Sequence, residues 1–70
     1  MKVKIYDVEL KEDYIKRWDG VLSMMSYFYL CETEEGKTFL TYGEGYSQIP
    51  ISWGDVKRAK FILEEEWEEV

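Results

Sequence analysis

The stretch that decides the fold is SWGDVKRAKFILEEEWEEV, residues 52–70, and its pattern predicts a helix. Ser52 is a favoured N-cap residue, and Asp55 follows it at the spacing of a capping box. Beyond Asp55, apolar residues recur at three- and four-residue steps, which is typical of an amphipathic helix. These residues are Val56, Ala59, Leu63, Trp67 and Val70. We therefore expect a C-terminal amphipathic helix that packs on one face of a sheet.

The charges of this stretch are placed backwards for a helix. Lys57, Arg58 and Lys60 lie in its first half, where the helix macrodipole disfavours cations. Carboxylates crowd its last turns, where the dipole disfavours anions, and each misplacement costs about 0.3–1 kcal/mol at low salt. A sequence that breaks a local rule this often suggests a function. The candidate partner-binding residues here are Glu64, Glu65, Glu68, Glu69 and Phe61, the last of which lies outside the apolar stripe.

Three interpretations of this acidic end stay open. It is a solvated tail, or it contacts a protein with a basic surface, with Trp67 as the anchor. In the third interpretation its carboxylates mimic the phosphate backbone of a nucleic acid inside the channel of an enzyme. The spacing of the glutamates favours a broad display, because helical positions 64, 65, 68 and 69 spread over more than half of the circumference.

The rest of the chain predicts a small, mainly antiparallel sheet. Val3–Leu10 is rich in β-branched residues, as strands are, and its alternation slips between Ile5 and Tyr6 as at a bulge or a twisted edge. The further elements expected are a short helix at 12–18, a central strand at 21–33, a strand at 37–42 and an edge strand at 46–51 that contains Pro50. For 21–33 a buried helix stays open as the alternative, because periodicity does not separate the two in an apolar run. The predicted fold class is α+β, a single domain of 70 residues with three or four strands and the C-terminal helix on one face.

A tight turn at Glu35-Gly36 is predicted to join the two central strands. With a two-residue loop, one face carries Met25, Tyr27, Tyr29, Cys31, Leu40 and Tyr42, and the other carries Met24, Phe28, Leu30 and Phe39. Both faces are apolar, whereas one helix covers only one of them. We therefore expect a partner or a second copy of the chain to cover the tyrosine-rich face, at Met25, Tyr27, Tyr29 and Tyr42.

Composition narrows the chemistry that the chain can perform. It has no histidine and one cysteine, so a Ser-His-Asp or Cys-His constellation, the usual zinc ligand sets and an intrachain disulfide are excluded. Cys31 lies in an apolar run without a neighbouring cation, which favours a thiol of the core. We expect a protein that is not an enzyme and that binds no cofactor and no metal.

The net charge of −6 is unevenly distributed. Residues 1–31 are neutral overall, so the whole acidic excess lies in residues 32–70. An acidic surface suits a protein partner with a basic surface, and the lack of a Lys/Arg cluster disfavours direct binding to nucleic acid, including base stacking on the tyrosines. No apolar run reaches the length of about 18 residues that spans a membrane, and no signal peptide is evident. The lone cysteine then favours the cytoplasm.

These observations favour a non-enzymatic protein-binding module, an inhibitor or adaptor of a basic partner that handles nucleic acid. In size and charge the chain is similar to the small acidic inhibitors encoded by phages and mobile elements, an analogy that no residue motif supports. The alternative is a self-associating structural domain that forms a homodimer through its tyrosine-rich face.

Overall fold

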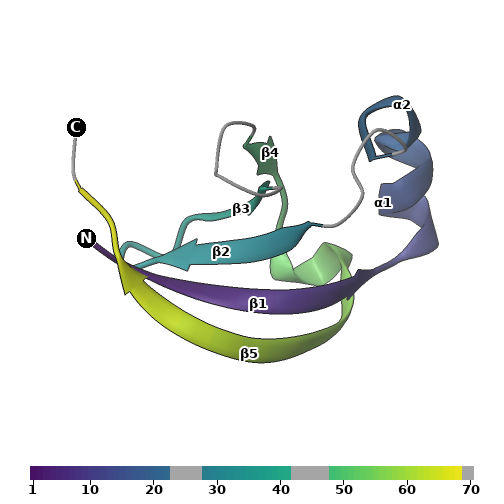
Figure 1. The fold of residues 1–70 in the computed structure, drawn as a ribbon. Coiled ribbons are helices and arrows are strands. Elements are labelled where there is room, and N and C mark those ends of the chain that lie inside the picture. The colour runs from purple at the N-terminus through teal and green to yellow at the C-terminus, as the bar shows by residue number, and fades with distance from the viewer. Residues whose placement is uncertain (23–27, 42–47, 69–70) are drawn as a thin grey trace.

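The computed structural model describes residues 1–22, 28–41 and 48–68, which form one antiparallel sheet flanked by short helices (Figure 1). Five strands lie in the order β4-β3-β2-β1-β5, so strands from the two ends of the chain are neighbours. The strands are β1 Lys2–Leu10, β2 Tyr29–Thr33, β3 Thr38–Thr41, β4 Ile49–Pro50 and β5 Val56–Glu66. The helical elements are α1 Glu12–Arg17, α2 Asp19–Leu22 and the single 3-10 turn η1 Trp53–Asp55.

The predicted C-terminal helix is wrong, because residues 56–66 form β5 and pair along β1. The sheet accordingly has five strands rather than three or four. The predicted capping box does form, with Ser52 as the N-cap and its N–H donating to Asp55 Oδ2 at 3.2 Å. It closes only η1, since the chain is already extended at Val56. The described part of the chain is therefore dominated by its sheet and contains no long helix.

Charge matching with β1 explains why this segment is a strand. Both β1 and β5 begin with basic residues and end with acidic ones, so their antiparallel pairing brings opposite charges face to face. The facing pairs are Lys2–Glu66, Lys4–Glu64, Asp7–Lys60 and Glu9–Arg58. Among these, Glu9 and Arg58 form an ion pair at 3.8 Å. Opposite charges that face each other across a ladder contribute roughly 0.2–1 kcal/mol, whereas the same charges would oppose the dipole of a helix. Tertiary pairing thus overrides the helical periodicity.

The pairing of β1 with β5 contains two irregularities. The register shifts between Ile5 and Tyr6 and again between Glu9 and Leu10. The first shift lies at Ile5–Tyr6, where the sequence indicated a bulge or a twisted edge, but the extra residue, Ile62, is on β5 and not on β1. The extra residue of the second shift is Lys57. Bulges of this kind increase the local twist of the strand that holds them.

In the hairpin between β2 and β3, the strand register differs by one residue from the register expected for a two-residue loop. The Thr33 N–H donates to the Lys37 carbonyl at 2.9 Å, so three residues rather than two form the loop. Gly36 supplies the left-handed conformation that such a loop requires, with φ of +85°. Tyr29 therefore faces Thr41 instead of Tyr42, and Cys31 faces Phe39.

Most expected boundaries shift within the described residues: the strand expected at 37–42 is β3 Thr38–Thr41, and the edge strand expected at 46–51 is β4 Ile49–Pro50. The short helix expected at 12–18 is present as α1. The long central strand expected at 21–33 is shorter, because residues 21 and 22 belong to α2 and β2 begins at Tyr29. Residues 23–27 lie outside the described part of the chain.

The main core lies between the sheet and the short helices. Its buried members are Leu10, Tyr14, Leu22, Leu30, Leu40, Ile49 and Ile51. The hydroxyl of Tyr14 donates to the Pro50 carbonyl at 2.8 Å and so ties α1 to β4. Burial, together with the nearby Asp55 carboxylate and against the Arg17 guanidinium, raises the pKa of Tyr14 to about 12.

The opposite face of the sheet holds a second buried group, Val3, Cys31 and Thr33. Cys31 is fully buried, which confirms the core thiol expected from the sequence. Its burial, and secondarily the Glu65 carboxylate, raises the pKa of the thiol to about 11. Trp67 follows β5 and packs on Phe39 with ring centroids 6.0 Å apart, so it is half-buried without belonging to a helical stripe.

Candidate interaction surface

β5 forms an edge of the sheet and, among the described residues, pairs on one side only, with β1 (Figure 1). We call the side of residues 56–66 that faces away from β1 the β5 edge. The strand is eleven residues long and is exposed from Lys57 to Glu66. Large apolar side chains occupy its centre, with Phe61 52%, Ile62 44% and Leu63 40% exposed. A long exposed edge presents main-chain donors and acceptors to which another strand can pair.

Hydrogen bonds at both ends of β5 identify the backbone groups that point outward. Met1 and Trp67 exchange two bonds, of 2.7 and 2.9 Å, and the Lys11 N–H donates to the Asp55 carbonyl at 3.0 Å. Such pairs alternate along an antiparallel ladder with pairs whose groups point away from each other. The odd-numbered residues of β1 therefore bond to β5. The β5 residues opposite even-numbered ones point outward, and these are Val56, Ala59, Phe61, Glu64 and Glu66.

An aromatic cluster fixes the side chain at the centre of the β5 edge. Tyr6 lies in edge contact with both Phe61 and Trp53, at centroid distances of 5.6 and 5.0 Å. The Trp53 indole N–H donates to Glu32 Oε2 at 2.9 Å, and 40% of Trp53 is exposed. Such edge-to-face contacts favour one ring orientation. The apolar surface thus extends from β5 onto β1 and η1.

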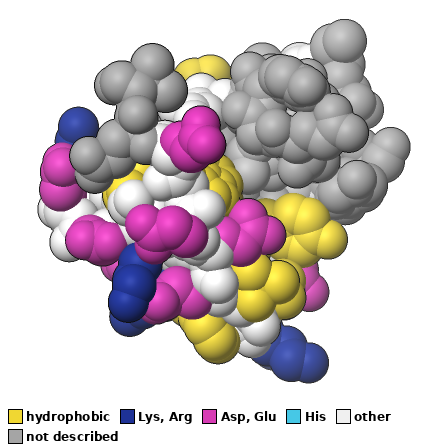
Figure 2. All heavy atoms as spheres, turned by 60° about the vertical axis from the view of Figure 1, so that its left-hand side comes forward, with side chains coloured by type: hydrophobic (Ala, Val, Ile, Leu, Met, Phe, Trp, Pro, Cys, Tyr) yellow, Lys and Arg dark blue, Asp and Glu magenta, His cyan; other side chains and the backbone are white. Residues whose placement is uncertain are grey.

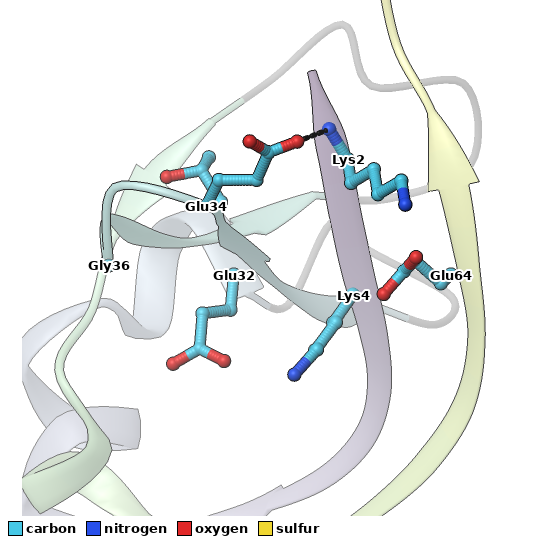
Figure 3. Close-up of a pocket in the computed structure, with 7 residues that line it drawn as sticks. Lys2, Lys4, Glu32, Glu34, Gly36 and Glu64 are labelled. Atoms are coloured by element: carbon cyan, nitrogen blue, oxygen red, sulfur yellow. Dashed lines mark hydrogen bonds between the residues drawn. The ribbon is translucent and has the colours of Figure 1, made fainter.

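Acidic side chains gather at the end of the sheet that carries the N-terminus, with a few basic ones among them (Figure 2). Glu32 and Glu34 at the end of β2 and Glu64 on β5 line an open hollow of about 410 Å³ (Figure 3). Lys2 and Lys4 of β1 lie between these carboxylates, and the Lys2 N–H donates to Glu34 Oε1 at 2.6 Å. The hollow therefore mixes both charges, and the acidic half of β5 forms one of its walls.

The structure separates the acidic residues that the sequence grouped together. Glu64 and Glu65 are both exposed, but they lie on opposite faces of the sheet because they are adjacent in a strand. Glu65 accepts a hydrogen bond of 2.9 Å from the Trp67 indole. Glu68 is exposed beyond the end of β5, and Glu69 lies outside the described residues. The acidic helix end expected from the sequence is therefore the acidic half of an edge strand.

The tyrosine-rich face is described only in part. Met25, Tyr27 and Tyr42 lie outside the described residues, and Tyr29 is half-buried in β2. Phe61 is exposed, as expected of a contact residue, but the sequence reasoning missed its neighbours Ile62 and Leu63. It also missed the approach of Glu32 to β5 across β1. β1 and β5 share a basic-to-acidic order of charges. This order could have indicated that they pair, and with it the exposure of Ile62 and Leu63 and the position of Glu32 relative to β5.

Within the described ranges, no group of three or more His, Cys, Asp or Glu side chains is placed to hold a metal ion. No helix in that part of the chain has the length and apolar character needed to cross a membrane. Comparisons of the chain with protein families, curated proteins and solved structures find no match.

Proposed function

We propose that this chain is a non-enzymatic protein-binding module that engages its partner by strand addition along the β5 edge. The observation that carries the proposal is an edge strand of eleven residues with three large apolar side chains exposed at its centre. In strand addition, main-chain hydrogen bonds supply affinity and the side chains supply specificity. The exposed apolar centre would lose its contact with water when the partner strand is in place.

The charges of β5 define the partner strand that fits. Basic residues of β5 precede its apolar centre and acidic residues follow it. An antiparallel partner needs basic residues opposite Glu64–Glu66 and acidic residues opposite Lys57–Lys60, so its own order along the chain is basic, apolar, acidic. The sequence predicted a partner with a basic surface. The charge order of β5 requires basic residues only at the start of the bound partner strand. An inhibitor or an adaptor can act by such a contact.

We propose that the chain acts in a reducing compartment, the cytoplasm. The single cysteine of the sequence, which the fold buries completely in β2, supports this compartment. A lone buried thiol is typical of proteins that fold without disulfides.

A pair of synthetic peptides tests strand addition. The first peptide carries lysines, then β-branched apolar residues, then glutamates, and the control has the same composition with its charges alternating in sign. We expect the first to slow hydrogen exchange at the outward-pointing amides of β5, namely those of Ala59, Phe61, Glu64 and Glu66. The experiment uses dilute protein and reads each amide by NMR.

The proline variant Ala59→Pro is the matched control on the protein side. It removes an outward N–H and leaves the β1 ladder intact, so it should weaken peptide binding without unfolding the protein. Strand addition at this edge would be contradicted if the outward amides exchanged as fast with saturating peptide as without it. Equal affinity for the two peptides would contradict it as well.

A further inference from the structure

We infer that the strand that occupies the β5 edge is β5 of a second copy of this chain. The two copies would pair antiparallel about a two-fold axis perpendicular to the sheet, and two five-stranded sheets would become one continuous sheet. This inference rests on the proposed strand-addition function and names its partner.

The order of charges along β5 is the first argument. On its inner side β5 is matched by β1, whose charges run from basic to acidic. An antiparallel strand on the outer side must have the same order, and β5 itself has it, with Lys57–Lys60 before the apolar centre and Glu64–Glu66 after it. The β5 edge is therefore self-complementary, as an isologous interface must be.

The bulge at Ile62 is the second argument. Before the bulge the main-chain groups of the odd-numbered residues Ala59 and Phe61 point outward. After it those of the even-numbered residues Glu64 and Glu66 do. A regular strand cannot follow both halves of such an edge, and bulges protect many edges for this reason. A second copy brings the same irregularity. With the axis between residues 62 and 63, Phe61 lies opposite the partner's Glu64 and Ala59 lies opposite the partner's Glu66.

This register also pairs the charged side chains. Lys60 lies opposite the partner's Glu65, and both side chains lie on the same face of the sheet, because Lys60 faces Asp7 and Glu65 faces Val3 on β1. Lys57 and Arg58 are already engaged by Glu9, at 3.5 and 3.8 Å. Lys60 faces Asp7 across the ladder but forms no ion pair with any described residue, so it is the cation of β5 that is available to a partner. The two-fold axis forms this pair twice.

The apolar centre completes the interface. Ile62 and Leu63, 44% and 40% exposed, would lie against Leu63 and Ile62 of the other copy. Phe61 remains held by Tyr6 on the other face of the sheet, opposite the partner's Glu64. Ile62 and Leu63 of one copy are thus covered by the same two residues of the other, between flanking ion pairs.

A charge-swap experiment followed by sedimentation equilibrium tests the pairing. We expect the natural chain to dimerise at micromolar concentration. Lys60→Glu and Glu65→Lys should each raise the dimer dissociation constant about tenfold or more, because two attractive pairs become repulsive in either homodimer. An equimolar mixture of the two variants should recover a heterodimer of nearly natural strength, since both pairs are then attractive. Lys37→Glu, which changes the same charge on the hairpin, is the control and should leave the dimer unchanged.

Three results would overturn the inference. They are a monomer at every concentration, a dimer that Ala59→Pro and Lys60→Glu both leave intact, or single-variant defects that the mixture does not repair. Because Glu65→Lys also removes the acceptor of the Trp67 indole, circular dichroism checks its fold, and Ala59→Pro gives an independent arm. A monomer whose β5 amides are still protected by the basic-apolar-acidic peptide would refute the second copy alone. A monomer without that protection would refute strand addition as well.

Discussion

The two edges of the sheet are built in opposite ways. The β4 edge is two residues long and ends in Pro50, which has no N–H to offer, and its neighbouring carbonyls are bound by side chains. The Tyr14 hydroxyl donates to the Pro50 carbonyl, and the Thr38 hydroxyl donates to the Ile51 carbonyl. The β5 edge is eleven residues long, with large apolar side chains exposed at its centre. Edges that are not used for binding are commonly protected in the manner of β4, so the exposed one indicates the interaction surface.

The largest predicted effect compares an isoleucine at each edge. Ile49 of β4 is 5% exposed and belongs to the core, so Ile49→Ala should cost about 2–5 kcal/mol of unfolding free energy. Ile62 of β5 is 44% exposed, and Ile62→Ala should cost about 0.5 kcal/mol or less in dilute protein. Urea denaturation at low concentration measures both. Equal losses would mean that Ile62 is packed within the monomer, and the contrast between the edges would disappear.

The second prediction uses proline to separate the two sides of β5. Lys60 points its N–H toward Asp7 of β1, so Lys60→Pro breaks the ladder and should cost about 3 kcal/mol. The N–H of Ala59 points outward, so Ala59→Pro should lower the unfolding free energy by less than half as much as Lys60→Pro does. Thermal melts give the comparison, with Lys60→Ala as the control for the lost charge. A larger loss at Ala59 than at Lys60 would reverse the assignment of inner and outer backbone groups.

The third prediction concerns the hydroxyl that protects the β4 edge. Tyr14→Phe removes its hydrogen bond to the Pro50 carbonyl and should cost about 1 kcal/mol near neutral pH. The folded-state pKa of Tyr14 is raised from 10.0 to about 12, so the folded protein binds this proton more tightly than the unfolded chain does. Its contribution is complete below pH 10 and is lost as the pH rises toward 12.

Denaturation curves between neutral and alkaline pH check this behaviour. Tyr14→Phe should flatten the alkaline loss of stability, and the raised pKa of Cys31, about 11, should account for part of what remains. Cys31→Ser is a less suitable control because it places a hydroxyl in a fully buried site. An alkaline profile that is identical with and without the Tyr14 hydroxyl would exclude this group as the source.

The smallest predicted effect tests the charge matching of β5 with β1. In a helix, replacing the late glutamates by glutamine would stabilise the chain, because anions would leave the negative end of the dipole. In the strand, Glu64 faces Lys4, so Glu64→Gln should instead destabilise by about 0.2–1 kcal/mol. Glu68→Gln, beyond the end of β5, is the matched control and should change nothing. The measurement is a thermal melt at low salt, and a stabilised Glu64→Gln variant would contradict the strand pairing.

Local features of the sequence were predicted where local physics decides them. Neighbouring residues decide β1, the start of α1 at Glu12 and the Ser52–Asp55 contact. The hairpin register was off by one residue, because Gly36 accepts a left-handed conformation in loops of either length. Of the candidate site residues, Phe61, Glu64 and Glu65 do lie exposed on one element, but on a strand with two faces.

By itself, the sequence determined the composition of the interaction surface, with its basic start, apolar centre and acidic end. Only the tertiary structure decided that residues 56–66 form a strand. Their spacing fits a helix, but β1 lies alongside with opposite charges facing them at four positions and with main-chain groups to pair. A helix satisfies its hydrogen bonds within itself, whereas a strand needs a neighbour. The paired residues of the two strands lie between 46 and 64 positions apart in the sequence, from Leu10–Val56 to Lys2–Glu66, beyond the reach of any local pattern.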